Sequence, residues 1–259
     1  MKRLWGRIAG RVLCGLGLGA CSAGSPLPGM EPGEQGRVVR VIDGDALVLN
    51  TGQVVRLVGI EAPVLKPRGR DPDPHALEAS RTLEDMVLGR EVQIYYPGLT
   101  RDRYDRALGH LVTTDQAGPQ LWVNMELIRR GAARVRLYPD TAAKGEAMLA
   151  AETVSRDDGV GLWGKTAYRV RSIGGLEAEQ RGFQLVSARL GRALPVPQDI
   201  PVELSCVRAA EGTDWRIEVR VEAAMICDLP IGLPVRLRGW VSEGRLDLTH
   251  ELHAERLED

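Results

Sequence analysis

The stretch VVRVIDGDALVLN, residues 38–50, is followed after a short turn by VVRLVGIEAP, residues 54–63. Its β-branched runs are separated by Asp43-Gly44 and by Asn50-Thr51-Gly52, which are residues that favour turns. This pattern predicts three short consecutive strands within residues 37–60. A carboxylate-rich turn between two strands places polar side chains at one end of a sheet, and the rest of the chain decides whether they have a function.

The segments that follow alternate between helical and extended patterns. Small and apolar residues recur at helical spacing over residues 74–88, and a glycine follows this segment. Alternating apolar residues predict a strand through Val92, Ile94 and Tyr96. A fifth strand is expected at 108–113, and further helices at 122–130 and 141–156. Five strands mixed with three helices indicate an α+β fold.

Composition excludes several classes of protein. The chain has 259 residues, of which 44% are hydrophobic and 27% charged, as in globular proteins rather than disordered ones. No apolar run approaches the length of about 18 residues that a membrane-spanning helix needs. The formal net charge is −1, so a nucleic-acid ligand would have to be held by a local basic patch.

The first residues, MKRLWGRIAGRVLCGLGLGAC, combine a basic start with a short apolar stretch. This pattern predicts a signal peptide over residues 1–20. Leu18-Gly19-Ala20-Cys21 resembles the lipobox of bacterial lipoproteins, which implies cleavage before Cys21 and a lipid on its sulfur; the alternative is an ordinary signal peptide. Residues 21–36 are rich in Pro and Gly and are expected to form a flexible tether. The protein is therefore expected to be exported, and either anchored by lipid in the cell envelope, on the periplasmic side, or secreted.

Composition changes near residue 171. Residues 37–170 carry a net charge of +1, whereas residues 171–259 hold 11 arginines and 15 acidic residues, a net of −4. The second segment is rich in predicted strands and is expected to form a small β domain. Cys206 and Cys227 remain after signal removal, and an oxidising compartment favours a disulfide between them over two buried thiols. Trp215 and Trp240 either stack on nucleic-acid bases or pack in the core of this domain, and core packing is favoured because Trp215 shares its face with Ile217 and Val219.

Several motifs occur in a characteristic order: VVRVIDGDALVL, VVRLVGIEAP, PHALEA, DRYDRALGHL, VNMELIRRGAARV and GLWG. Together they resemble the staphylococcal nuclease (thermonuclease) family over residues 37–164. The resemblance implies a five-stranded OB-type β-barrel with three helices, assigned here to residues 37–170. It also implies Ca²⁺-dependent cleavage of phosphodiester bonds in nucleic acid, single- or double-stranded and without sequence preference.

The resemblance assigns roles to individual residues. It implies that Asp45, Glu61 and the carbonyl of Ala62 hold Ca²⁺, which prefers oxygen ligands. Arg56 and Arg106 match the two arginines that neutralise the phosphate as it gains charge. The supporting residues implied by the resemblance are Asp43, which shapes the metal loop, and Asp102 and Tyr104, which shape the loop presenting Arg106.

Two departures from the family pattern bear on activity. Val64 stands where the family has the glutamate that activates water, and general-base help is worth about 10²–10⁴ in rate. Asp71 and Asp73, in the loop 65–73, are either substitute bases or solvated loop charges. Asp105 replaces a glycine and is expected to pair with Arg106. These departures predict an attenuated nuclease. The alternatives are a non-catalytic nucleic-acid or anion-binding module of the cell envelope, and a structural envelope protein.

Overall fold

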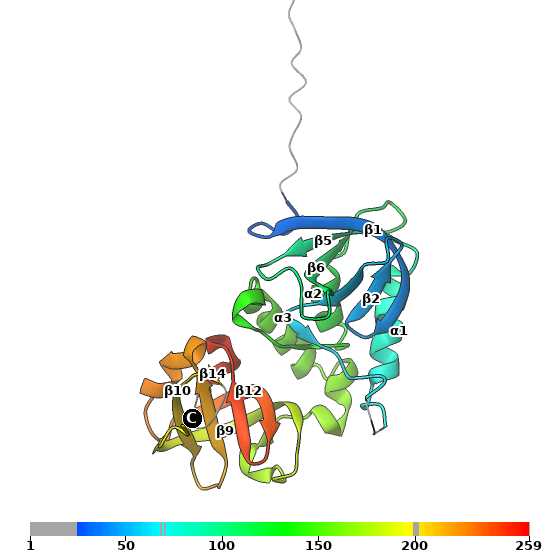
Figure 1. Ribbon diagram of the computed structural model, residues 1–259. Coiled ribbons are helices and arrows are strands. Elements are labelled where there is room, and N and C mark those ends of the chain that lie inside the picture. The colour runs from blue at the N-terminus through cyan, green and yellow to red at the C-terminus, as the bar shows by residue number, and fades with distance from the viewer. Residues whose placement is uncertain (1–24, 68, 70, 199–201, 259) are drawn as a thin grey trace, which may run out of the picture.

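The computed structural model describes residues 25–67, 69, 71–198 and 202–258, and shows two lobes, each built around a β-barrel (Figure 1). In the first lobe, β1 pairs with both β2 and β5, and β3 pairs in parallel with β6, which closes a five-stranded barrel in the order β1-β2-β3-β6-β5. The strands of this lobe are β1 (Glu31–Asp43), β2 (Ala46–Leu49), β3 (Val54–Leu57), β4 (Ile60–Glu61), β5 (Glu91–Tyr96), β6 (Ala107–Thr113) and β7 (Arg134–Val135).

The helices of this lobe are α1 (Ala76–Val87), α2 (Val123–Arg129) and α3 (Gly145–Asp157). Helix α1 buries Ala79, Leu83 and Val87 against the barrel, as the helical spacing of these residues predicted. Helix α3 begins later than expected because residues 139–141 form a separate 3₁₀ turn, η1 (Pro139–Thr141). The predicted fold class, an α+β protein with a five-stranded OB-type barrel and three helices, is confirmed.

The expected tether reaches too far along the chain. Residues 31–36 already belong to β1, where Glu31 pairs with Tyr96 and Gly36 pairs with Val92. The Pro- and Gly-rich composition suggested a flexible segment, but β1 accommodates glycine at a position where the neighbouring strand leaves no room for a side chain. A Cβ on Gly33 would overlap the ring of Tyr96. Within the described residues the extended segment before the barrel is therefore shorter than predicted.

The second lobe is also a closed barrel. Its order is β9-β10-β11-β13-β12, closed by pairing of β12 with β9, and β11 runs parallel to β13. The order and the parallel pair are the same as in the first barrel, so the expected small β domain also has an OB-type topology. Its strands are β8 (Arg171–Ser172), β9 (Gly182–Leu194), β10 (Leu204–Ala210), β11 (Arg216–Arg220), β12 (Pro234–Ser242), β13 (Arg245–Leu248) and β14 (Ala254–Arg256).

Single-turn and longer 3₁₀ helices connect these strands. They are η2 (Gly161–Gly164), η3 (Thr166–Tyr168), η4 (Ile173–Gly175), η5 (Val221–Asp228) and η6 (Glu251–His253). A disulfide joins Cys206 of β10 to Cys227 of η5, with their Cα atoms 6.0 Å apart. The expected disulfide between these two cysteines is thus present in the structure. Trp215 is buried as expected, whereas Trp240 is 44% exposed and lies outside the core.

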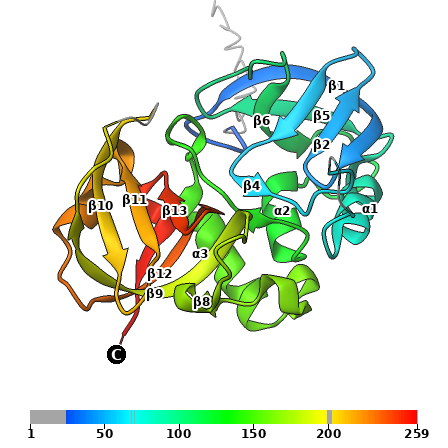
Figure 2. The ribbon, with the colours of Figure 1, turned by 60° about the horizontal axis from the view of Figure 1, so that its bottom comes forward.

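Polar side chains buried between the lobes connect them. Arg238 of β12 pairs with Glu152 of α3 at 2.6 Å, and both side chains are buried. Figure 2 shows the second barrel packed beside α3. Removing one partner of such a pair leaves the other as an unpaired buried charge, which costs about 3–5 kcal/mol. Among the helices that the structure describes, none has the length and apolar character needed to cross a membrane.

Candidate active site

Asp45 and Arg56 meet at the end of the first β-hairpin. The turn between β1 and β2 places Asp45 just before β2, and pairing of β2 with β3 puts Ala46 opposite Arg56. One oxygen of the Asp45 carboxylate accepts a hydrogen bond from Arg56 Nη1, and the other accepts from the backbone N–H of Ala62 at 2.9 Å. Asp45 is only 2% exposed, so its charge depends on these partners.

Arg56 also reaches the second predicted carboxylate. Its Nη2 donates to Glu61 Oε2 at 3.0 Å, from strand β3 to strand β4. Burial lowers the pKa of Arg56, and the nearby Glu61 carboxylate opposes this shift. Arg56 therefore bridges the two carboxylates that the sequence assigned to the metal, and the structure brings these predicted site residues together.

A third arginine, which the sequence analysis did not single out, joins the cluster. Arg136 Nη1 donates to Glu61 Oε2 at 2.8 Å, and its Nη2 donates to the hydroxyl of Tyr138. Strand β4 positions it, because Glu61 pairs with Arg134 and the N–H of Arg136 donates to Gly59 O at 3.0 Å. The only sequence signal was the alternation of arginine with apolar residues over 134–137, which predicts a strand but does not indicate its partner.

Arg106 approaches the same cavity from the other side. Its Nε donates to Asp102 Oδ2 at 2.7 Å, and Asp102 Oδ1 accepts from the backbone N–H groups of Tyr104 and Arg106. Although burial opposes the change, these hydrogen bonds lower the pKa of Asp102. Asp102 thus connects the backbone of this loop to the Arg106 side chain, while the Tyr104 side chain is exposed.

The expected pairing of Asp105 with Arg106 is wrong. Asp105 has φ of 61°, in the left-handed region that a glycine adopts without strain, and its side chain is 92% exposed. Instead, its Oδ1 lies 3.7 Å from Nε of Arg101. Because Asp102 already takes the guanidinium of Arg106, the extra carboxylate at position 105 is directed away from the site.

Three further residues considered in the sequence, Asp43, Val64 and Asp73, make contacts in or beside the loop after β4. Asp43 Oδ1 accepts hydrogen bonds from the backbone N–H of Gly44 at 2.9 Å and of Leu65 at 3.2 Å, so Asp43 fixes the loop. Val64 lines the cavity and presents an apolar side chain there. Asp73 Oδ2 accepts from the backbone N–H of Val64 at 2.9 Å, which gives it a structural contact in this loop.

A cavity of about 600 Å³ lies between the first barrel and the segment that contains η1. Arg56, Arg106 and Arg136 all line it, together with Glu61 and Asp102. Three guanidinium groups at one concave surface suit a ligand with several anionic oxygens, because each arginine presents a planar fork to phosphate.

The donor set fits Ca²⁺ in part. Asp45 and Glu61 both bind Arg56, so their carboxylates converge within reach of one group, and hard carboxylate and carbonyl oxygens are what Ca²⁺ prefers. Ala62 adjoins them through its hydrogen bond to Asp45. In the part of the chain that the structure describes, no group of three or more His, Cys, Asp or Glu side chains could hold a metal. Any cation would thus have two protein carboxylates and would compete with arginines for them.

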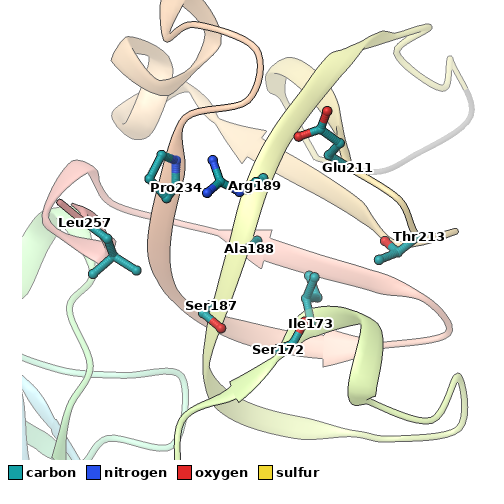
Figure 3. A pocket seen from close by; sticks show the side chains of 9 residues that line it. All are labelled: Ser172, Ile173, Ser187, Ala188, Arg189, Glu211, Thr213, Pro234 and Leu257. Carbon is teal, nitrogen blue, oxygen red and sulfur yellow. The ribbon is translucent and has the colours of Figure 1, made fainter. Parts of the chain in front are cut away.

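A second cavity, of about 480 Å³, lies in the second barrel (Figure 3). Ser187 and Arg189 project into it from β9, and Glu211 and Thr213 line it from the segment between β10 and β11. Arg189 Nη1 donates to Gly232 O at 2.9 Å. This cavity shares no residue with the arginine-lined one and brings together no pair of carboxylates. The predicted lipidation site, Cys21, lies outside the described residues.

The geometry agrees with comparisons with known proteins. Residues 54–165 match the model of the family described as "Staphylococcal nuclease homologue". Residues 54–165 are thus similar to a staphylococcal nuclease domain. The matched range contains Arg56, Glu61, Arg106 and Arg136, whereas Asp45 lies nine residues before it.

Curated relatives also match part of this chain. "Probable endonuclease LCL3" of Phaeosphaeria nodorum is 30% identical over 144 residues, covering 52% of this chain and 46% of that protein. "Probable endonuclease lcl3" of Pyrenophora tritici-repentis is 32% identical over 129 residues, covering 47% of this chain and 44% of that protein. "Uncharacterized endonuclease" of Escherichia coli O157:H7 is 36% identical over 103 residues, covering 39% of this chain and 60% of that protein. The alignments with the first two relatives thus span about half of each protein.

Proposed function

We propose that this protein is a Ca²⁺-dependent phosphodiesterase that cleaves nucleic acid slowly. The observation that carries the proposal is the position of Arg56, which contacts both Asp45 and Glu61 and lines one cavity with Arg106. Carboxylates for a cation and arginines for phosphate are the groups that phosphoryl transfer requires. The endonuclease names of the relatives support the same reaction class.

The chain's own residues account for most of the chemistry. Arg56 and Arg106 bind the phosphate and neutralise the charge that it gains as water attacks. Asp45, Glu61 and the Ala62 carbonyl would hold Ca²⁺, which supplies Lewis-acid polarisation of the phosphate oxygen when bound. Asp102 keeps the Arg106 guanidinium oriented through its hydrogen bond at 2.7 Å. Asp43 keeps the loop after β4 in place through its backbone contacts.

Val64 limits the rate. An isopropyl group cannot accept a proton, so water must be deprotonated by solvent or by a weaker base. Phosphate binding and charge neutralisation remain, since neither depends on Val64. Cleavage is therefore expected to be slower than with a glutamate at this position, by about 10²–10⁴.

A second candidate function is binding of nucleic acid or another anion without cleavage. It is favoured by the absence of a base at Val64 and by the pairing of Glu61 with two arginines. Incubation of the purified protein with labelled single-stranded DNA, double-stranded DNA and RNA separates the two functions. The nuclease gives products with Ca²⁺ and none with a chelator. The binding module gives a mobility shift that weakens with salt, and no products under either condition.

The place of action is part of the proposal. A lipid on Cys21 would hold the barrels near a membrane surface on the non-cytoplasmic side. At roughly 5–6 Å × √n, the nine residues between Cys21 and β1 would reach at most about 15–18 Å as a flexible chain, and less because Leu27 and Met30 are buried in a cluster with Tyr95 and Val112. Nucleic acid met there is foreign, released by lysis or in transit across the envelope, which favours a nutritional, defensive or uptake-linked role.

A further inference from the structure

Arg136 lies against three aromatic rings, one from the segment before η1 and two from the second barrel. Its Cζ lies 4.8 Å from the ring centre of Tyr138, 5.1 Å from that of Trp240 and 5.6 Å from that of Phe183. Trp240 of β12 and Phe183 of β9 face each other as cross-strand partners in the second barrel. A guanidinium held against aromatic faces loses part of its freedom before a ligand arrives.

The backbone beside Arg136 is also held by the second barrel. Arg238 donates to the carbonyl of Val135 at 3.1 Å, and the backbone N–H of Leu137 donates to His253 Nε2 at 2.9 Å. These contacts lie on the two residues that flank Arg136 in the chain. The second barrel therefore fixes both the backbone and the side chain of a residue that lines the nuclease cavity.

Arg136 has capacity left for a ligand. Of its five N–H groups, one donates to Glu61 and one to Tyr138, and the other three have no hydrogen-bond partner among the described residues. Its side chain lines the same cavity as Arg56 and Arg106. Trp240 is 44% exposed beside it, whereas Phe183 and Trp215, the other aromatic residues of the second barrel, are buried.

We propose that Arg136 is a third phosphate-binding residue of the site, and that Trp240 and Phe183 are its positioning residues. The second barrel is thereby part of the substrate-binding site, although it lies outside the nuclease domain. The proposal rests on the proposed function, because its ligand is a phosphate of the nucleic-acid backbone next to the one that is cleaved. The competing role for Arg136 is that of a counter-ion that only neutralises Glu61.

The test measures binding of a fluorescent single-stranded oligonucleotide by anisotropy, in chelator and over a range of salt concentrations. Each phosphate contact contributes about 0.7 to the slope of log K against log salt for a single strand. Arg136→Gln should lower the affinity and reduce the slope by about 0.7. Trp240→Ala should lower the affinity and raise KM for cleavage with little change in kcat, and Trp240→Phe should restore both.

Two controls decide between the roles of Arg136. Ile231→Ala, at a 66% exposed position of the second barrel outside this cluster, should bind as wild type does. In the background Glu61→Gln, which needs no counter-ion, Arg136→Gln should still reduce the salt slope. An unchanged slope there, or wild-type KM in Trp240→Ala, overturns the inference while leaving the nuclease proposal intact. A wild type that neither binds nor cleaves overturns both.

Discussion

The carboxylate of Asp73 accepts a hydrogen bond from the backbone N–H of Val64 at 2.9 Å. Asp73 was one of two loop acids that could have replaced the missing base. Its contact with the backbone of Val64 ties it to the loop after β4. The cavity is thus lined by three arginines and by Glu61 and Asp102, while Val64, which stands where the resemblance places the base, is apolar.

Val64→Glu should accelerate cleavage, because it places a carboxylate where a base is needed. The expected gain is up to about 10²–10⁴ in kcat. Val64→Gln is the matched control, because glutamine is polar and nearly the size of glutamate but its amide cannot take the proton. This variant should cleave at the wild-type rate. A fast wild type that Val64→Glu leaves unchanged would show that another base operates.

Asp45→Asn and Glu61→Gln should each weaken Ca²⁺ binding by on the order of tenfold or more, because each removes a charged oxygen ligand. Calorimetric titration with Ca²⁺ measures this directly. Asp71→Asn, at an exposed loop position, provides a control with the same loss of charge. If wild type takes up no Ca²⁺, the metal site is removed from this account and the binding module is favoured.

The sequence predicted most of the first barrel, because each of its strands and helices has a strong local pattern. It also predicted Asp45, Arg56, Glu61 and Arg106, which belong to recognisable motifs. It could not predict Arg136, whose role depends on the pairing of β4 with β7 and on rings about 45 and 100 residues away in the chain. The closed second barrel was missed for a similar reason, because closure depends on pairing between β9 and β12, which no local pattern specifies.

His253 should make stability depend on pH. Burial lowers its pKa to about 2, from about 6.5 in the unfolded chain. As the pH falls below 6.5 the unfolded state takes up a proton that the folded state does not, so the free energy of unfolding falls by about 1.4 kcal/mol per pH unit. His253→Gln keeps an acceptor for the N–H of Leu137 and should remove this contribution.

Urea unfolding at several pH values between 7 and 4.5 checks the prediction. The stabilities of wild type and His253→Gln should converge as the pH falls. His110, whose pKa burial lowers to about 3, should leave a similar slope in both proteins. Parallel curves for the two proteins would show that His253 is not held neutral at the interface between the barrels.

Cys21→Ala should release the protein from the membrane fraction or leave it unprocessed, because the thiol that would carry the lipid is lost. Cys14→Ala changes a cysteine within the predicted signal peptide and should fractionate as wild type does. Fractionation followed by mass spectrometry of the N-terminus measures both effects. Membrane association and processing of Cys21→Ala like those of wild type would rule out the lipid anchor.

The most direct test of the central claim is the rate at which the purified protein cleaves a labelled single-stranded oligonucleotide as Ca²⁺ is titrated, measured beside Arg56→Ala prepared in the same way. Wild type should show slow cleavage that saturates with Ca²⁺ and stops with a chelator. Arg56→Ala should be slower by about 10²–10³, as when one group that stabilises a developing anion is removed. Equal rates for the two proteins, or no Ca²⁺-dependent products from wild type, would contradict the assignment of this cavity as a nuclease active site.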